Sequence, residues 1–164
     1  MAMIAVMLAG CAPTPTPTPT PTAPFASEEE AFAAAEETYR AYTDATNRTD
    51  LDDPKTFAPV YDWLVGEALT AAIENYGEFH AAKITRTGAS TFDTFDPTKY
   101  SPTRITVRLC LDVSNVELFD ATGASAVPVD RPPRRPIEVE FVPAGTPTTL
   151  AISSTIPTSE HPCD

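Results

Sequence analysis

The sequence predicts an α+β fold in which N-terminal helices pack on one face of a curved antiparallel sheet. Between residues 27 and 82, apolar side chains recur every three or four positions, which is the spacing of amphipathic helices. From residue 105 onward they alternate with polar side chains, as in half-buried strands. Helices followed by consecutive strands are typical of the α+β class.

Three helices are expected in the first half. Ser27 followed by Glu30 forms a capping box, and a stripe at helical spacing follows it: Phe32, Ala35, Tyr39, Tyr42 and Thr46. Asp53 before Pro54 predicts the start of a second, short helix. A third helix is predicted from about Gly66 to Ala82, with an inward face made of Leu69, Ala72, Ile73, Tyr76 and Phe79.

The second half predicts strands. The strongest alternation runs from Ile105 to Val113, and two further strands centre on Ile137–Phe141 and Leu150–Ile156. Val116–Phe119 and Ala124–Val129 are expected to pair as a hairpin around a glycine-containing turn.

A short apolar segment opens the sequence and ends in the string Leu8-Ala9-Gly10-Cys11. It is too short to span a bilayer, which takes about 20 residues, and it is followed by a polar linker, as a signal peptide is. The string resembles the lipobox of a bacterial lipoprotein precursor. This resemblance implies a signal peptide at residues 1–10 and a Cys11 that carries acyl chains such as palmitate. A buried strand or helix followed by a cysteine is the alternative.

Residues 11–24 are expected to be a linker. Pro-Thr is repeated five times from Pro13 to Thr22, and proline at every second position excludes both helix and sheet. An extended polyproline II tether of roughly 40 Å would hold the following domain, residues 25–164, away from a membrane surface. The expected location is therefore the extracytoplasmic face of the bacterial cell membrane, with the lipid at Cys11 as the anchor.

The charge of the chain excludes some partners. Eleven Lys and Arg stand against 23 Asp and Glu, so the net charge is −12, and all charged residues follow the linker. Such a surface repels nucleic acid phosphates and anionic lipid headgroups. We therefore expect no nucleic acid partner and no peripheral adsorption to lipid.

The chain contains three cysteines, an odd number. If Cys11 is lipidated, Cys110 and Cys163 remain as a pair, which predicts a disulfide in an oxidising compartment. Two free thiols in a reducing compartment are the alternative. No Cys-x-x-Cys motif or cysteine and histidine cluster is found, so no metal site is predicted.

Several short strings resemble one superfamily. Thr38-Tyr39-Arg40-Ala41-Tyr42, followed by Asp53-Pro54 and Phe57, resembles the NTF2-like (SnoaL-like) superfamily. Cys110-Leu111-Asp112-Val113-Ser114 and the terminal Pro162-Cys163 are similar to small actinobacterial lipoproteins within it. The resemblance implies a cone of helices and bent sheet around an apolar pocket, used by some members for catalysis and by others for binding or dimerisation.

Four residues are candidates for lining that pocket: Tyr42, Trp63, His80 and Asp112. His80 near the end of the third helix could act as an acid or base, or simply interact with the helix dipole. Asp112 could pair with Arg108 inside the cavity, or the two could form a surface ion pair. The aromatic residues could contact a ligand or belong to the core.

Arg131, Arg134 and Arg135 form a small basic group among prolines, which suggests either a solvated loop or a docking spot for an acidic partner. No paired nucleophile and base, phosphate-binding glycine loop or cofactor motif is found, so neither a catalytic residue nor a cofactor is predicted. The sequence favours a non-catalytic, membrane-anchored lipoprotein that binds an envelope protein or a small ligand. The alternative is an extracytoplasmic SnoaL-like enzyme that uses acid and base groups in the cavity.

Overall fold

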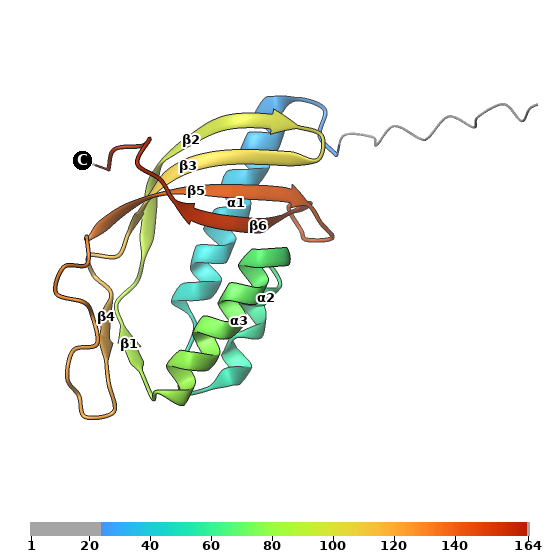
Figure 1. Ribbon diagram of the computed structural model, residues 1–164. Helices are drawn as coiled ribbons and strands as arrows, with labels where there is room; N and C mark the ends of the chain where they lie inside the picture. Colours follow the sequence, from blue (N-terminus) through green and yellow to red (C-terminus); the bar gives the residue numbers. More distant parts are fainter. Residues whose placement is uncertain (1–23, 164) are drawn as a thin grey trace, which may run out of the picture.

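The computed structural model describes residues 24–163, in which helices pack against a twisted antiparallel sheet (Figure 1). The predicted signal peptide, Cys11 and almost all of the predicted linker lie outside the described residues. Within residues 24–163, no helix combines the length and the apolar character that crossing a bilayer requires.

The first helix, α1 (Glu28–Asn47), begins at the predicted capping box. The Ser27 hydroxyl accepts a hydrogen bond from the Glu30 backbone N–H at 3.2 Å, and the Glu30 carboxylate accepts one from the Ala26 N–H at 2.9 Å. These two bonds satisfy N–H groups that have no partner within the helix, which is why the helix begins here.

The predicted second helix also begins where expected, but it is divided in two. Asp53 caps a 3-10 turn, η1 (Pro54–Thr56), by accepting a hydrogen bond from the Lys55 N–H, and the short α2 (Ala58–Tyr61) follows. The third helix is α3 (Gly66–Ala81), one residue shorter than predicted.

Four antiparallel strands form the main sheet in the order β2 (Thr91–Ser101), β3 (Arg104–Asp112), β5 (Arg134–Pro143) and β6 (Leu150–Pro157). A separate pair, β1 (Thr85–Thr87) with β4 (Glu117–Phe119), extends from one end of it. Figure 1 shows α1 lying across one face of the main sheet. The predicted α+β class, with helices on one face of the sheet, is confirmed.

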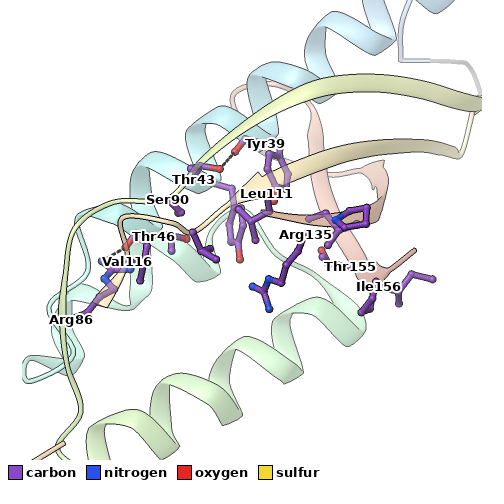
Figure 2. Close-up of a pocket in the computed structure, with 15 residues that line it drawn as sticks. Tyr39, Thr43, Thr46, Arg86, Ser90, Leu111, Val116, Arg135, Thr155 and Ile156 are labelled. Atoms are coloured by element: carbon purple, nitrogen blue, oxygen red, sulfur yellow. Dashed lines mark hydrogen bonds between the residues drawn. The ribbon is translucent and has the colours of Figure 1, made fainter. Parts of the chain in front are cut away.

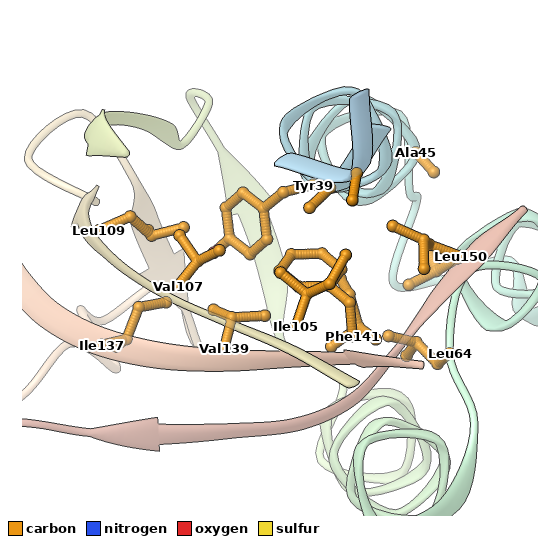
Figure 3. Packing of buried hydrophobic residues seen from close by; sticks show 14 residues of the cluster. Tyr39, Ala45, Leu64, Ile105, Val107, Leu109, Ile137, Val139, Phe141 and Leu150 are labelled. Carbon is orange, nitrogen blue, oxygen red and sulfur yellow. The ribbon is translucent and has the colours of Figure 1, made fainter. Parts of the chain in front are cut away.

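The core lies between α1 and that face of the sheet (Figure 3). Every second residue of β3 and β5 points into it: Ile105, Val107 and Leu109 from β3, and Ile137, Val139 and Phe141 from β5. Tyr39 of α1 is only 2% exposed and packs its ring edge against Phe92 of β2, with 4.8 Å between ring centroids. The alternation that predicted these strands is therefore the alternation of buried and outward side chains.

The predicted inward face of the third helix is partly wrong. Leu69, Ala72 and Tyr76 pack against the core, but Ile73 is 50% exposed and Phe79 is 36% exposed. No residue of α3 is buried. The reason is that α3 lies beside the edge strand β6 and has few elements to pack against, whereas α1 lies across the centre of the sheet.

The predicted hairpin is also partly wrong. Its first half is β4, but β4 pairs with β1, and the second half contributes only a single bridge between Phe119 and Ser125. Gly88 makes this pairing possible. Its φ is +75°, and a Cβ atom there would overlap the Asn115 carbonyl oxygen, so only glycine fits.

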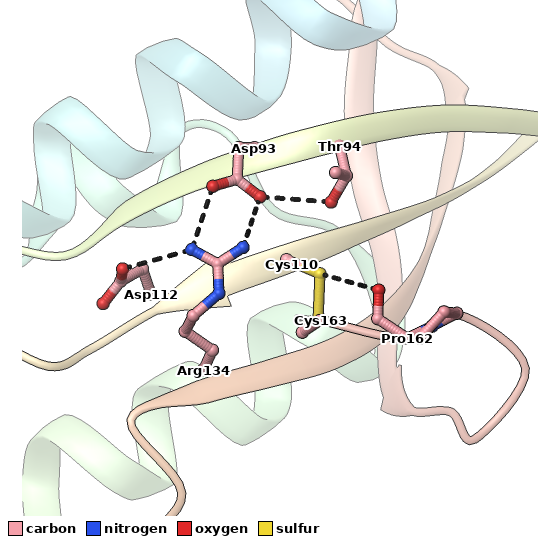
Figure 4. Close-up of a disulfide and its surroundings, with 7 residues drawn as sticks. All are labelled: Asp93, Thr94, Cys110, Asp112, Arg134, Pro162 and Cys163. Atoms are coloured by element: carbon pink, nitrogen blue, oxygen red, sulfur yellow. Dashed lines mark hydrogen bonds and ion pairs between the residues drawn. A yellow bond between two sulfur atoms is a disulfide. The ribbon is translucent and has the colours of Figure 1, made fainter.

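The predicted disulfide between Cys110 and Cys163 is present, with 5.6 Å between the Cα atoms (Figure 4). Cys110 lies on the face of β3 that points away from α1, and it is fully buried. The disulfide therefore ties the C-terminal segment to the outer face of the sheet.

Candidate functional site

A cavity of about 400 Å³ opens between α1 and the core-facing side of the sheet (Figure 2). One wall consists of successive turns of α1, namely Tyr39, Tyr42, Thr43 and Thr46. The opposite wall is formed where the strands end: Leu111 on β3, Arg135 and Ile137 on β5, and Thr155 on β6. This volume is within the range of small-molecule sites.

A second cavity of about 490 Å³ adjoins the first, since Tyr42, Arg135, Thr155 and Ile156 line both. Its far wall is α3, which presents small side chains at helical spacing: Ala68, Ala71 and Ala72. The short side chains leave space between α3 and β6 that a longer residue would fill. The two cavities thus share a border at Arg135.

The lining of the first cavity has no carboxylate, imidazole, primary amine or thiol, because its residues, all among the described ones, include no Asp, Glu, His, Lys or Cys. The charged residues of its lining are Arg86 and Arg135. Arg86 donates hydrogen bonds to the carbonyl oxygens of Thr46 and Thr49, at 2.6 and 3.0 Å, and so satisfies the C-terminal end of α1.

Arg135 differs from Arg86 in having no such role. Among residues 24–163 its guanidinium forms no hydrogen bond and no ion pair. Successive side chains of β5 point to opposite faces, so Arg135 lies on the same, core-facing side as Ile137 and Val139. Its cross-strand neighbour on β3 is Leu111. Figure 2 shows its side chain extending from the sheet into the space between the helices. Arg135 is itself exposed, so this arginine lies at the solvent-facing side of an otherwise mostly apolar cavity.

The phenols of the cavity stay protonated at neutral pH. Burial raises the pKa of Tyr39 far above its ordinary value; the neighbouring Tyr42 adds to the rise and the positive charge of Arg135 opposes it. Burial, together with Tyr76, also raises the pKa of Tyr42. Both hydroxyls are therefore neutral hydrogen-bonding groups, and neither is a base.

Of the four residues predicted to line a pocket, Tyr42 lines both cavities and the other three line neither. Trp63 packs partly buried against the core, and its carbonyl oxygen accepts a hydrogen bond from the Ile152 N–H at 2.9 Å. The His80 Nδ1 lies 2.9 Å from the Leu51 carbonyl oxygen, which fixes the imidazole against the loop after α1. Neither Trp63 nor His80 lines either of these two cavities.

Asp112 lies on the outer face of the sheet and lines neither of these two cavities (Figure 4). Its carboxylate accepts hydrogen bonds from the Ser114 N–H at 2.8 Å and from Arg134 at 3.3 Å. Arg108 does not pair with Asp112; it pairs with Glu138 at 3.1 Å and with Glu160. Side chains two residues apart in a strand share a face but need not touch, and here the neighbouring strand supplies the nearer partners.

The basic group, expected to be either a solvated loop or a docking spot for an acidic partner, is divided among three environments. Arg131 donates to the carbonyl oxygens of Val113 and Val116, at 3.0 and 2.7 Å. Arg134 pairs with carboxylates on the outer face, and Arg135 lies on the cavity side. The sequence did contain a signal for Arg135. The alternation that places Ile137 on the core-facing side of β5 also places Arg135, two residues earlier, on that side. Among residues 24–163, no group of three or more His, Cys, Asp or Glu residues is arranged to hold a metal ion.

No protein-family model matches this sequence, and no curated protein sequence matches it. Solved structures do resemble its fold. The intermembrane space region of the chloroplast protein ARC6 superposes with a TM-score of 0.55 at 14% identity, covering 76% of this chain and 94% of that one. A protein described as a putative aromatic ring hydroxylase from Novosphingobium aromaticivorans gives 0.54 at 12% identity, covering 80% and 96%.

A protein from Catenulispora acidiphila, solved in complex with S-DNPA, gives a TM-score of 0.53 at 12% identity, covering 79% of this chain and 92% of that one. At these identities the similarity concerns the fold alone. The neighbours from Catenulispora and Novosphingobium are NTF2-like, and three helices on an antiparallel sheet are consistent with the cone of that fold. The NTF2-like architecture predicted from the sequence is therefore confirmed.

Proposed function

We propose that this chain is a bacterial lipoprotein precursor, anchored through Cys11, whose NTF2-like domain holds a small ligand without transforming it. The observation that carries the ligand-binding part is the cavity beside α1. It has the volume of a ligand site, largely apolar walls and an arginine with no protein partner among residues 24–163. Its lining, within the described residues, includes no group that could serve as a general base at neutral pH.

The anchoring part is supported by the sequence and by the disulfide. Small residues precede Cys11 in the Leu8-Ala9-Gly10-Cys11 string, and a proline-rich spacer follows it. Disulfides persist in oxidising compartments and are rare in the cytosol, so the Cys110–Cys163 bond supports an extracytoplasmic location. A stiff spacer also suits a domain of net charge −12, which anionic headgroups repel.

Lipidation is tested by expressing the full chain in a bacterial host supplied with an alkyne analogue of palmitate. The chain is expected to incorporate the label and to partition into the detergent phase of Triton X-114. The Cys11→Ala variant is expected to do neither, because it lacks the Cys11 thiol that would carry the lipid. Label incorporation equal in both variants, or absent from both, would contradict the anchor.

Ligand binding is tested with N-phenyl-1-naphthylamine, a neutral apolar molecule whose fluorescence rises when it leaves water. The full chain with Cys11→Ala is used because it needs no detergent, which would itself bind the probe. Saturable binding is expected. Thr155→Trp is expected to abolish it, because Thr155 is exposed and borders both cavities. Binding that Thr155→Trp leaves intact would refute the cavity as the ligand site.

A further inference from the structure

We propose that the ligand is a small organic monoanion, with its apolar body against Tyr39, Leu111 and Ile137 and its carboxylate or similar oxyanion paired with Arg135. This inference rests on the proposed ligand-binding function and names the class of ligand. The guanidinium of arginine presents paired N–H groups that match an oxyanion with two hydrogen bonds.

The first argument is that Arg135 has no partner while most other arginines do. Arg40, Arg104, Arg108 and Arg134 each lie within 4.0 Å of a carboxylate, and Arg86 and Arg131 donate to backbone carbonyls. Acidic residues outnumber basic ones 23 to 11, so carboxylate partners are abundant in the chain. An arginine left without one among residues 24–163, at the border of two cavities, can pair with an acidic group that arrives from outside.

The second argument is the position of Arg135. Arg135 lies on the core-facing side of β5, the side on which Ile137 and Val139 are buried. Leu111 is its cross-strand neighbour on β3, and the aromatic ring of Tyr39 lines the same cavity. Because Arg135 is exposed, an ion pair with it keeps contact with water and contributes modestly by itself. The apolar walls therefore carry most of the binding. They also fit the uncharged part of an amphiphilic ligand.

The third argument is an unsatisfied polar atom in the same cavity. The Thr46 hydroxyl oxygen is buried and forms no hydrogen bond of ordinary geometry among residues 24–163, although it lies close enough to the Tyr42 hydroxyl to lower the pKa of that phenol. Buried polar groups normally have partners, so this hydroxyl is suited to bond an oxygen or nitrogen atom of the bound molecule. Of its two arginines, only Arg135 has no protein partner among residues 24–163, and with the Thr46 hydroxyl and the apolar walls it fits a monoanion with a mostly apolar body.

The test compares two fluorescent probes that differ by one acidic group. One is 8-anilinonaphthalene-1-sulfonate, and the other is its uncharged counterpart, N-phenyl-1-naphthylamine. Dissociation constants are measured for the full chain with Cys11→Ala and for the same chain with Arg135→Gln added. We expect Arg135→Gln to weaken binding of the sulfonate by about fivefold, since an ion pair at an exposed arginine is lost, and to leave binding of the neutral probe unchanged.

Three further variants make the result specific. Arg104→Gln removes the same charge from the surface and is expected to change neither affinity, because Arg104 lies outside both cavities. Arg135→Lys keeps the charge but not the paired N–H groups, so it is expected to bind the sulfonate with intermediate affinity. Thr155→Trp is expected to block both probes.

The outcomes separate this inference from the function on which it rests. If Arg135→Gln leaves the sulfonate affinity unchanged, or if Arg104→Gln lowers it equally, the anion inference is overturned although the cavity still binds. If neither probe shows binding that Thr155→Trp removes, the ligand-binding function itself is overturned. Retained binding of the neutral probe by Arg135→Gln shows that this variant is folded.

Discussion

Two neighbouring arginines, Arg134 and Arg135, lie on opposite faces of β5 and have opposite roles. Arg134 donates to the two carboxylate oxygens of Asp93, at 2.8 and 3.0 Å, and to Asp112 at 3.3 Å (Figure 4). It therefore connects β2, β3 and β5 on the outer face. Arg135 is one residue further along and points into the cavity. The pleat of the strand, which turns successive side chains to opposite faces, accounts for this difference.

The pairing of Arg134 predicts a loss of stability in acid. Its hydrogen bond holds the pKa of Asp93 below the usual value, and the Ser114 hydroxyl and N–H, followed by Arg134, do the same for the pKa of Asp112. Carboxyls whose pKa is lowered in the folded state stabilise it above their unfolded pKa of about 3.9. That stability disappears as the pH falls through the folded values.

Urea unfolding measured from neutral pH down to about pH 3 is expected to show a smaller acid-induced loss of free energy in Arg134→Gln than in the unsubstituted chain. Arg104→Gln, which removes the same charge from a different pair, is expected to retain the full loss. If the free energy of unfolding falls equally with pH in the unsubstituted chain and in Arg134→Gln, the pairing of Arg134 with Asp93 and Asp112 is not the cause of the acid-induced loss.

At the scale of elements, the C-terminal segment depends on β3 for its position. It lies over the outer face of the sheet through the Cys110–Cys163 disulfide and through the ion pair between Arg108 and Glu160. Glu160 is 68% exposed, so its ion pair contributes little to stability. The disulfide is the main constraint, because it closes a loop that contains all of β5 and β6.

Cys163→Ser is expected to lower the free energy of unfolding by about 4 kcal/mol, the chain-entropy value for a loop of this length. The cysteines are 53 residues apart, so the cross-link removes many conformations from the unfolded chain. Chemical denaturation measures the loss, and Glu160→Gln serves as the control that removes only the ion pair. A loss no larger than that of Glu160→Gln would show that the bond does not stabilise the fold.

The elements that sequence patterns predicted are those with one buried face. The strands β3 and β5 have one side that meets the core, β6 is buried only at its first three residues, and α1 begins at a capping box that is a purely local signal. The strand β2 was missed. It is an edge strand containing Asp93, Asp96 and Pro97, residue types that disfavour strands, and bulges interrupt its pairing with β3.

At the scale of the whole molecule, the second cavity lies where α3 packs only partly against the sheet. The helix buries none of its residues and lies beside the edge strand β6, with small side chains facing the second cavity. Its first turn has no side-chain cap, and Gly77 in its interior lowers its helix propensity. The core between α1 and the sheet, by contrast, is continuous.

Hydrogen exchange is therefore expected to differ between these parts. Amides of α3 should exchange through local opening faster than those of β3 and β5, since a helix with few buried contacts opens at lower free energy. Saturation with N-phenyl-1-naphthylamine should slow exchange in the later turns of α1, because Tyr42, Thr43 and Thr46 line the first cavity. Protection of ligand-free α3 equal to that of β3 would contradict this description.

The sequence alone determined the α+β class, the start of α1, the three main strands and the cysteine pair, because caps, alternation and cysteine counts are local signals. Only the tertiary structure decided which residues form the cavity. Tyr42 and Arg135 are far apart in the chain, and the curvature of the sheet brings them together, whereas His80 and Asp112 are directed elsewhere by partners on other elements. A residue's own strand sets the face on which it lies, but packing between distant segments sets what it meets there.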